Sequence, residues 1–310
     1  MKVVFFAIIK LLLIIFLGFF LYRKKILNQE ALKFLTFFVV NITVPFLIFT
    51  EIITHLNPEN IPPLYKFILL SIFIFSLGLF LGIIFSPFSK FPKEFIALVS
   101  FQNCGYLPMN LALFLFSSSF LRDTFLIYIF LYILGFNILM WSVGSFLIFK
   151  KKKEGFEVRS LFTMPIISII ISLLCVYLKI GRFFPDLIIS PLALVGKMSF
   201  PLSMILLGAW LAKGKRLGSR EALLASFIKL FLLPLIFFIL ILKFKLFSLW
   251  GFFILTQASM PSAASLPIVA QMRGGNSEVV SCGVFLSHVL ALFTVPIWLF
   301  LFSQISGFKF

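Results

Sequence analysis

Long apolar runs follow one another along the chain, separated by short breaks that are charged or rich in proline and glycine. A helix needs about 20 apolar residues to cross the hydrocarbon core of a bilayer. The pattern predicts an all-α polytopic membrane protein with ten transmembrane helices and no separate soluble domain. The predicted spans are residues 3–22, 31–53, 64–86, 94–118, 122–149, 161–179, 187–212, 221–243, 249–272 and 277–303.

The composition indicates that lipid surrounds most of the chain. Of its 310 residues, 62% are hydrophobic and 12% are charged, and the net charge is +17. Soluble domains carry roughly 25% charged residues, so a water-soluble globule is excluded. The basic residues lie mainly between the apolar runs, where they indicate topology and contact with anionic lipid head groups. We therefore expect membrane lipid as a partner and no nucleic acid.

Lysine and arginine are distributed unevenly between the predicted loops. The loops that follow odd-numbered spans hold the larger share, including the run KKKKEGFEVR at residues 150–159. Cytoplasmic loops are enriched in these residues. We therefore expect these loops to be cytoplasmic and both termini to be extracytoplasmic. The short loops and the missing organelle signal suit the cytoplasmic (inner) membrane of a prokaryotic cell.

The two halves of the chain carry similar patterns. When the two halves of the sequence are aligned, residues 41–45 (NITVP) align with residues 197–201 (KMSFP). The polar stretches of the fourth and ninth spans also align with each other. An odd number of spans in each half inverts the second half relative to the first, an arrangement common in secondary transporters. The predicted organisation is a five-helix repeat over 1–149, a basic cytoplasmic loop over 150–160 and a second five-helix repeat over 161–310.

Both polar stretches fall in the middle of a predicted span, at residues 102–110 and 257–267. Pro108 removes an amide donor, and Gly105 relaxes the backbone. Backbone groups freed in this way need partners, because hydrocarbon offers none. Two interrupted helices at matching positions predict a binding site near the midplane. The alternative is a pair of proline kinks packed against neighbouring helices without a ligand.

Four runs resemble the auxin efflux carrier family of PIN-like transporters, within the wider group of bile acid/sodium symporters. They are VVNITVPFLIFTEI, FQNCGYLPMNLALF, MPSAASLPIVAQM and VFLSHVLALFTVPIW. The resemblance extends over the whole chain. It implies a 5+5 inverted repeat in which helices 4 and 9 cross at their breaks. Spans 1, 2, 6 and 7 would form a scaffold, often dimeric, and spans 3–5 and 8–10 a moving transport domain.

The same resemblance places particular residues at the crossover. Asn103 and Pro108 match the first crossover, and either Pro261 or Pro267 corresponds to the crossing proline of the second. Family members transport organic anions such as auxin or small carboxylates. They do so with a proton, with sodium or with no established coupling.

Two polar residues of the aligned segments are candidates for substrate binding. Lys197 lies about ten residues from either membrane surface, where a charge costs at least ~2.5 kcal/mol, and it is expected to meet a carboxylate or to replace a coupling cation. Snorkelling to a lipid head group is the alternative. Asn41, at the equivalent place, is expected to bind substrate or to bond between helices. For Lys10 and Lys229, nearer span ends, snorkelling is expected.

The breaks and two titratable side chains complete the predicted site. The polar groups of the breaks that we expect to contact substrate are Gln102, Gln257, Ser259 and Ser265. The second break lacks an acidic residue, which disfavours a sodium site of the bile-acid-symporter kind. Glu51 and His288 are candidates for carrying a coupling proton. An interfacial position for Glu51 and a packing role for His288 are the alternatives.

Together these features predict a secondary active transporter of small organic anions. It would work by alternating access, with an elevator-type motion of helices 3–5 and 8–10. A sodium-coupled symporter of the bile-acid type, a channel and a structural membrane protein stay open as alternatives. An intramembrane enzyme would need a nucleophile with its base or a metal cluster. The sequence offers neither, and no cofactor or metal is expected.

Overall fold

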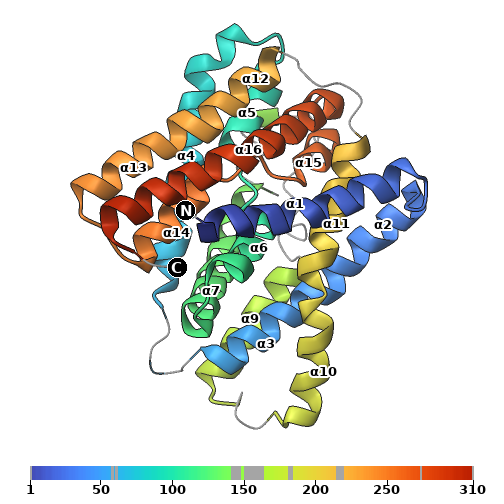
Figure 1. Cartoon of the computed structure of the whole chain (residues 1–310), viewed down its shortest axis with the longest axis vertical. Helices are drawn as coiled ribbons and strands as arrows, with labels where there is room; N and C mark the ends of the chain where they lie inside the picture. Colours follow the sequence, from blue (N-terminus) through green and yellow to red (C-terminus); the bar gives the residue numbers. More distant parts are fainter. Residues whose placement is uncertain are drawn as a thin grey trace.

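The computed structural model describes residues 2–56, 59, 62–140, 148–149, 164–180, 184–213, 220–272 and 274–308. Within these ranges it describes side chains from residue 13 onward, except at 138, 207, 210, 211, 213, 268, 271, 272 and 277. The basic loop expected at 150–160 lies outside these ranges. Regular structure in the described residues is helical, as the sequence predicts (Figure 1). Extended pairing there is limited to one isolated antiparallel bridge, between Gln102 and Ser262.

The helices follow the apolar runs closely. Their bounds are α1 Lys2–Arg23, α2 Gln29–Phe38, η1 Val39–Thr43, α3 Val44–His55, α4 Leu64–Phe85, η3 Ser86–Phe88, α5 Pro92–Ser100, α6 Tyr106–Leu115, α7 Ser119–Ile138, α9 Met164–Tyr177, α10 Asp186–Lys197, α11 Ser199–Lys213, α12 Arg220–Phe227, η7 Ile228–Leu232, α13 Leu233–Lys243, α14 Leu249–Ser259, α15 Leu266–Met272 and α16 Ser277–Ser306.

Six helical stretches in the described residues are long and apolar enough to cross a membrane: Gln29–His55, Leu64–Phe88, Ser119–Asn137, Asp186–Leu206, Arg220–Lys243 and Glu278–Ser306. Four shorter apolar helices accompany them: Leu13–Arg23, Tyr106–Leu115, Met164–Tyr177 and Leu249–Ser259. Each of these helices coincides with one of the apolar runs of the sequence. The chain is therefore a multi-pass membrane protein.

Proline residues explain most irregularities within the helices. The π-helical turns η1 and η7 directly precede helices with a proline at the second position, Pro45 in α3 and Pro234 in α13. A proline lacks an amide hydrogen and crowds the carbonyl four residues earlier, so the preceding turn widens. The run at 187–212 is also divided, because the helix is interrupted at Met198, shortly before Pro201.

Side-chain capping and glycine fix the ends of several helices. The side chain of Asn28 accepts the Ala31 amide at the start of α2, and Asn276 accepts the Val279 amide at the start of α16. Such caps satisfy amides that have no partner inside the helix. The long helix α16 ends at Gly307, which adopts the left-handed conformation with φ of 69°, as glycine does readily.

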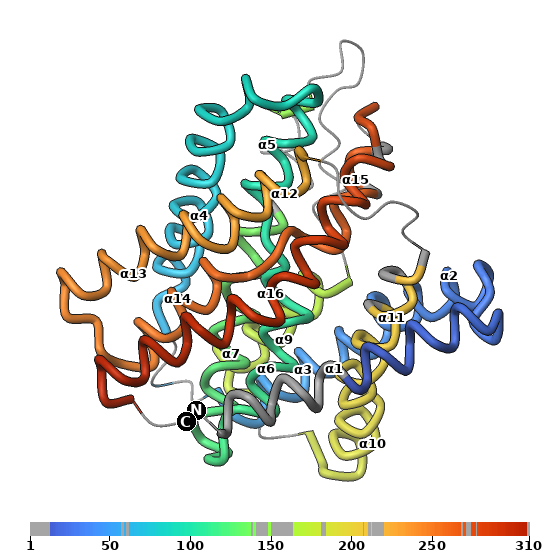
Figure 2. Tube along the Cα trace, turned by 45° about the horizontal axis from the view of Figure 1, so that its top comes forward, coloured from blue at the N-terminus to red at the C-terminus, as the bar shows by residue number. Residues whose placement is uncertain are grey.

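The helices pack in two groups (Figures 1 and 2). In one group α1 lies along α11, and α3 lies against α9 and α10. In the other, α4 packs on α5 and α7, and α16 packs on α12, α14 and α15. Helix α6 reaches from the second group to α1 and α11 of the first. The two interrupted helices, α5 with α6 and α14 with α15, belong to the second group, and of their four segments α6 is the one that contacts α1 and α11.

Candidate functional site

The first interrupted helix consists of α5 and α6. Helix α5 ends at Ser100, residues 101–105 are non-helical, and α6 begins at Tyr106. Pro108 lies in the first turn of α6, where amides have no partner within the helix and a missing donor costs little. Gly105 has a φ of −110°, which other residues also adopt. The expected relaxation of the backbone by this glycine is therefore not needed.

The second interrupted helix consists of α14 and α15. Helix α14 ends at Ser259, residues 260–265 are non-helical, and α15 begins at Leu266. Pro267 is the second residue of α15 and Pro108 is the third residue of α6, so each proline lies in the first turn of its helix. Pro261 instead lies in the break. The two prolines that the sequence left undistinguished thus have different roles.

The two breaks lie antiparallel to each other and exchange backbone hydrogen bonds. The amide of Asn103 donates to the carbonyl of Pro261 at 2.7 Å, and the amide of Ala263 donates to the carbonyl of Phe101 at 3.0 Å. Each break therefore supplies hydrogen-bond partners for backbone amides and carbonyls that the interruption of the other helix leaves free. Such partners are needed because hydrocarbon offers none.

Side chains fix this contact from both sides. The Ser262 hydroxyl donates to the carbonyl of Leu98 at 2.7 Å, and the Ser262 amide donates to the hydroxyl of Ser287 at 3.2 Å. The side-chain amide of Gln257 donates to the carbonyl of Cys104 at 3.1 Å. The breaks are thus bonded to each other, to α5 and to α16.

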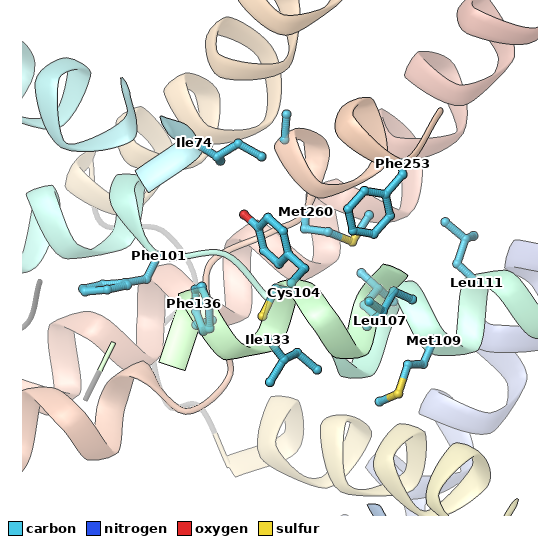
Figure 3. Packing of buried hydrophobic residues seen from close by; sticks show 14 of the residues in the cluster. Ile74, Phe101, Cys104, Leu107, Met109, Leu111, Ile133, Phe136, Phe253 and Met260 are labelled. Atoms are coloured by element: carbon cyan, nitrogen blue, oxygen red, sulfur yellow. The ribbon is translucent and has the colours of Figure 1, made fainter. Parts of the chain in front are cut away.

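Apolar side chains close the space around the breaks. Figure 3 shows Cys104 and Met260, one from each break, among residues that include Ile133 and Phe253. The rings of Phe253 and Tyr132 pack edge to face, with centroids 5.8 Å apart. These contacts join α7 to α14 and keep the polar groups of the breaks in a closely packed environment.

Asn103 connects the first break to α16. Its side-chain amide lies 3.0 Å from Nε2 of His288, and Nδ1 of His288 lies 2.8 Å from the carbonyl of Val284. This pattern fits a neutral imidazole that donates from Nδ1 and accepts at Nε2. Both nitrogens of His288 are therefore engaged, in the arrangement of a hydrogen-bonded packing residue.

Three fully buried polar atoms near the breaks have no hydrogen-bond partner among the described residues. Two are acceptors, Oε1 of Gln102 and Oε1 of Gln257, and the third is the donor Nζ of Lys229. The amide nitrogen of Gln102 is engaged, since it donates to the hydroxyl of Tyr132. Unsatisfied buried groups are costly to the folded state.

The exposure of the Lys229 and Lys197 side chains differs from what the sequence predicts. Lys229 was expected to snorkel, and this is wrong, because its side chain is 0% exposed. Lys197, the expected intramembrane cation, is the last residue of α10, and its side chain is exposed in this chain. Lys10 lies in α1 outside the described side chains.

The other candidate side chains are bonded near their own helices. Asn41, half-buried in η1, donates to the carbonyl of Phe37 at 2.9 Å. The Ser259 hydroxyl donates to the carbonyl of Thr256 at 3.0 Å, and the half-buried Ser265 hydroxyl contacts the sulfur of Met140 at 3.9 Å. The breaks therefore bring together Gln102, Asn103, Gln257 and Pro261, while Asn41 and Lys197 lie in the other group of helices.

A second polar cluster joins α3 to α7. Nε2 of His55 lies 3.7 Å from Oε2 of Glu51, and Nδ1 of His55 lies 3.5 Å from Oδ2 of Asp123. Asp123 also pairs with Nε of Arg122 at 3.0 Å. One ligand atom from each of Glu51, His55 and Asp123 lies within 4.8 Å of the others, so this cluster could hold a metal ion.

Sequence reasoning missed several members of these sites. The spacing of Glu51 and His55, four residues apart, places both on one helix face and was the available signal for the second cluster. Asp123 is distant in sequence and carried none. The burial of Lys229 was signalled only by its position within an apolar run.

Long apolar helices, two of them interrupted where polar residues meet, define a multi-pass membrane protein. Residues 3–299 match the sequence model of a protein family that is described as "Membrane transport protein". This is the auxin efflux carrier family. The chain belongs to this family, which confirms the resemblance. An uncharacterized transporter of Methanocaldococcus jannaschii is 23% identical over 304 residues, covering 94% of this chain and 96% of the relative.

Proposed function

We propose that the protein is a secondary active transporter of small organic anions, such as auxin-like molecules or small carboxylates, that works by alternating access. The observation that carries this proposal is the antiparallel contact between the two breaks, with the Asn103 amide bonded to the Pro261 carbonyl. Half-helices that meet at the midplane form the substrate site in many secondary transporters. Membership of a membrane transport family supports the same class of function.

The proposed architecture is a 5+5 inverted repeat of ten spans. In it α5 with α6 and α14 with α15 are the crossover helices. The contact between Ser199 and Thr43 supports the repeat, because these residues occupy equivalent places in the two aligned segments. The first repeat would extend over residues 1–149 and the second over 161–310.

The division of the helices into two packing groups supports an elevator-type motion. Helices α1, α2, α3, α9, α10 and α11 would form the scaffold, and α4 to α7 with α12 to α16 would move. The same scaffold would provide the surface for a homodimer. Positive-inside topology favours the cytoplasmic membrane, with both termini outside.

The proposed substrate site lies between the moving breaks and the scaffold. The positive ends of the α6 and α15 helix dipoles lie at the breaks and would attract a carboxylate. Lys197 and Asn41 would face it from the scaffold. The complete set of proposed contact residues is Asn41, Gln102, Asn103, Pro108, Lys197, Gln257, Ser259, Pro261, Ser265 and Pro267. Glu51 and His288 are the proposed carriers of a coupling proton.

Uptake into proteoliposomes tests this proposal. The purified protein is reconstituted and given radiolabelled indole-3-acetate, malate or malonate, with protein-free liposomes as the blank. We expect saturable uptake of at least one anion, reduced at least tenfold by Lys197→Ala and by Asn103→Ala. Lys243→Ala, a change of an exposed lysine in α13, is the matched control and should leave uptake unchanged.

Two results would contradict the proposal. A folded wild-type protein that moves none of the anions would remove the anion-carrier assignment. Single-channel currents in planar bilayers would identify a pore instead of a carrier. Uptake that persists in Lys197→Ala would keep the carrier but withdraw the role of this lysine.

A further inference from the structure

Three side chains that can bind metal ions meet where the C-terminal end of α3 lies beside the start of α7. Glu51 and His55 belong to α3, which ends at His55, and Asp123 belongs to α7, which begins at Ser119. One ligand atom from each of the three side chains lies within 4.8 Å of the others. Imidazole nitrogens and carboxylate oxygens are common ligands of divalent metal ions. Two helices therefore bring three potential ligands to one place.

The three side chains converge without hydrogen-bonding one another. Nε2 of His55 lies 3.7 Å from Oε2 of Glu51, and Nδ1 of His55 lies 3.5 Å from Oδ2 of Asp123. Ordinary N–H···O hydrogen bonds have donor–acceptor distances of about 2.7–3.2 Å. Oε2 of Glu51 is buried and has no hydrogen-bond partner among the described residues. A buried carboxylate oxygen therefore faces the imidazole with its bonding capacity unused.

These separations are close to those of ligands around one metal ion. Bonds from zinc to imidazole nitrogen and carboxylate oxygen are about 2.0–2.2 Å long, and tetrahedral geometry then places neighbouring ligand atoms about 3.4 Å apart. The observed contacts of 3.5 and 3.7 Å approach this value. An ion binds one of the two imidazole nitrogens, and the third ligand atom lies within 4.8 Å of it. Small side-chain rotations therefore complete the coordination.

The surroundings orient the ligands and admit an ion. Nε of Arg122 lies 3.0 Å from Oδ1 of Asp123, which leaves Oδ2 toward His55, and such second partners hold metal ligands in place. The two carboxylates outnumber the one guanidinium, so the local charge favours a cation beside a neutral imidazole. The side chain of His55 is 39% exposed, whereas those of Glu51 and Asp123 are mostly buried. An ion can therefore enter from the histidine side.

The set of ligands indicates the class of metal. Mg²⁺ and Ca²⁺ prefer sites built of oxygen atoms, whereas imidazole suits zinc and other first-row transition metals. One imidazole with two carboxylates therefore fits Zn²⁺ or a similar divalent ion. Three protein ligands leave the fourth tetrahedral position to a water molecule.

We propose that Glu51, His55 and Asp123 form a binding site for a divalent transition-metal ion that joins α3 to α7. Helix α3 packs in the first group of helices and α7 in the second, so a bound ion ties the two groups together. Transport is inhibited as a result, a consequence that rests on the proposed carrier function, in which these groups move past each other. Glu51 is also a proposed carrier of a coupling proton, and an ion on its carboxylate blocks that role.

Metal binding to the purified full-length chain tests the site without a substrate. Equilibrium dialysis against Zn²⁺ should find one ion per chain that is lost in each of three variants, His55→Gln, Glu51→Gln and Asp123→Asn, with affinity reduced at least tenfold. A ligand that binds the native state raises Tm, so Zn²⁺ should raise the Tm of the wild type by several degrees, and EDTA should reverse the rise. Mg²⁺ at equal concentration should have no such effect.

Two further variants control for general effects of substitution. Glu30→Gln removes an exposed carboxylate in the first turn of α2 and should bind Zn²⁺ like the wild type. His55→Cys replaces the imidazole by a thiolate, which is also a metal ligand but a softer one. It should recover the binding that His55→Gln loses and should prefer Cd²⁺ to Zn²⁺. This gain distinguishes a lost ligand from a damaged fold.

Uptake into proteoliposomes tests the inhibition. Zn²⁺ should reduce anion uptake at least fivefold in the wild type and in Glu30→Gln, and should not reduce the uptake that Asp123→Asn retains. Zinc that binds at the site but leaves wild-type uptake unchanged would overturn the tie between the groups.

Two results would overturn the site itself. One is Zn²⁺ binding that is unchanged in all three ligand variants, and the other is an equal rise in Tm with Mg²⁺. Neither measurement needs transport. A wild-type protein that binds Zn²⁺ but moves no anion in its absence would contradict the carrier proposal alone, so the two failures are distinguishable.

Discussion

The hydroxyls of Ser199 and Thr43 hydrogen-bond at 2.9 Å, although the two residues are 156 positions apart. Each residue lies two positions before a proline, Pro201 and Pro45, at an irregularity of its helix. The contact joins α11 to η1 in the buried interior. It pairs the two positions that coincide when the halves of the chain are aligned, which supports the proposed repeat.

This contact is open to a double-mutant cycle. We expect Ser199→Ala and Thr43→Val each to lower the free energy of unfolding by about 1 kcal/mol, the usual value of a buried hydrogen bond. The double variant should cost less than the two changes added together, because one interaction is removed twice. Denaturation in detergent measures all four proteins. Strict additivity would mean that the hydroxyls do not interact.

The bond between Asn103 and His288 predicts a cost for truncating Asn103. Asn103→Leu leaves Nε2 of His288 buried without a partner, and such a group costs about 1–3 kcal/mol. Thermal unfolding should show this loss, and anion uptake should fall with it. Lys243→Ala, a change of an exposed lysine in α13, is the control. An Asn103→Leu protein with wild-type stability would contradict the assigned bond.

Gly196 predicts a steric limit between α10 and α3. A Cβ atom added there would lie 2.6 Å from the backbone nitrogen of Leu47, so the helices would have to separate. We expect Gly196→Ala to destabilise the protein by about 1–3 kcal/mol, as overpacking does. Gly105→Ala is the contrast, since its Cβ would meet Cδ1 of Ile133 at an ordinary 3.4 Å. Melting temperatures that rank the two variants in the opposite order would refute this packing.

The polar cluster between α3 and α7 predicts a small effect on stability that depends on salt. Asp123→Asn weakens the pairing with Arg122 and His55, and partly exposed ion pairs contribute about 0–1 kcal/mol. The difference in Tm from the wild type should shrink at high salt, because salt screens exposed charges. Lys66→Gln is a control outside the cluster. A difference that grows with salt would show that Asp123 acts by another route.

The proposed topology predicts opposite accessibility for two loops. Lys24 follows α1 and Lys245 follows α13, and they should lie on the cytoplasmic and the outer side respectively. Single cysteines are introduced at each position after the three native cysteines are replaced. A membrane-impermeant maleimide added to whole cells should label the cysteine at 245 and not the one at 24. The reverse pattern would invert the topology.

Much of the fold was predictable because lipid leaves the backbone few choices. Apolar runs must be helical, since each amide and carbonyl needs a partner within the segment. The same argument located both breaks, because Pro108 and Pro267 each lie in the first turn of the helix that follows a break. The family resemblance and the candidate residues of the breaks were also accessible from the sequence.

The sequence by itself determined which segments are helical and where two of them are interrupted. The tertiary structure alone decided which side chains are buried, and so exchanged the expected places of Lys197 and Lys229. The physical reason is that these helices are apolar on all sides, so hydrophobic periodicity does not reveal the inward face. Only packing selected the face that carries Lys229, and only packing brought the Asn103 amide to the Pro261 carbonyl.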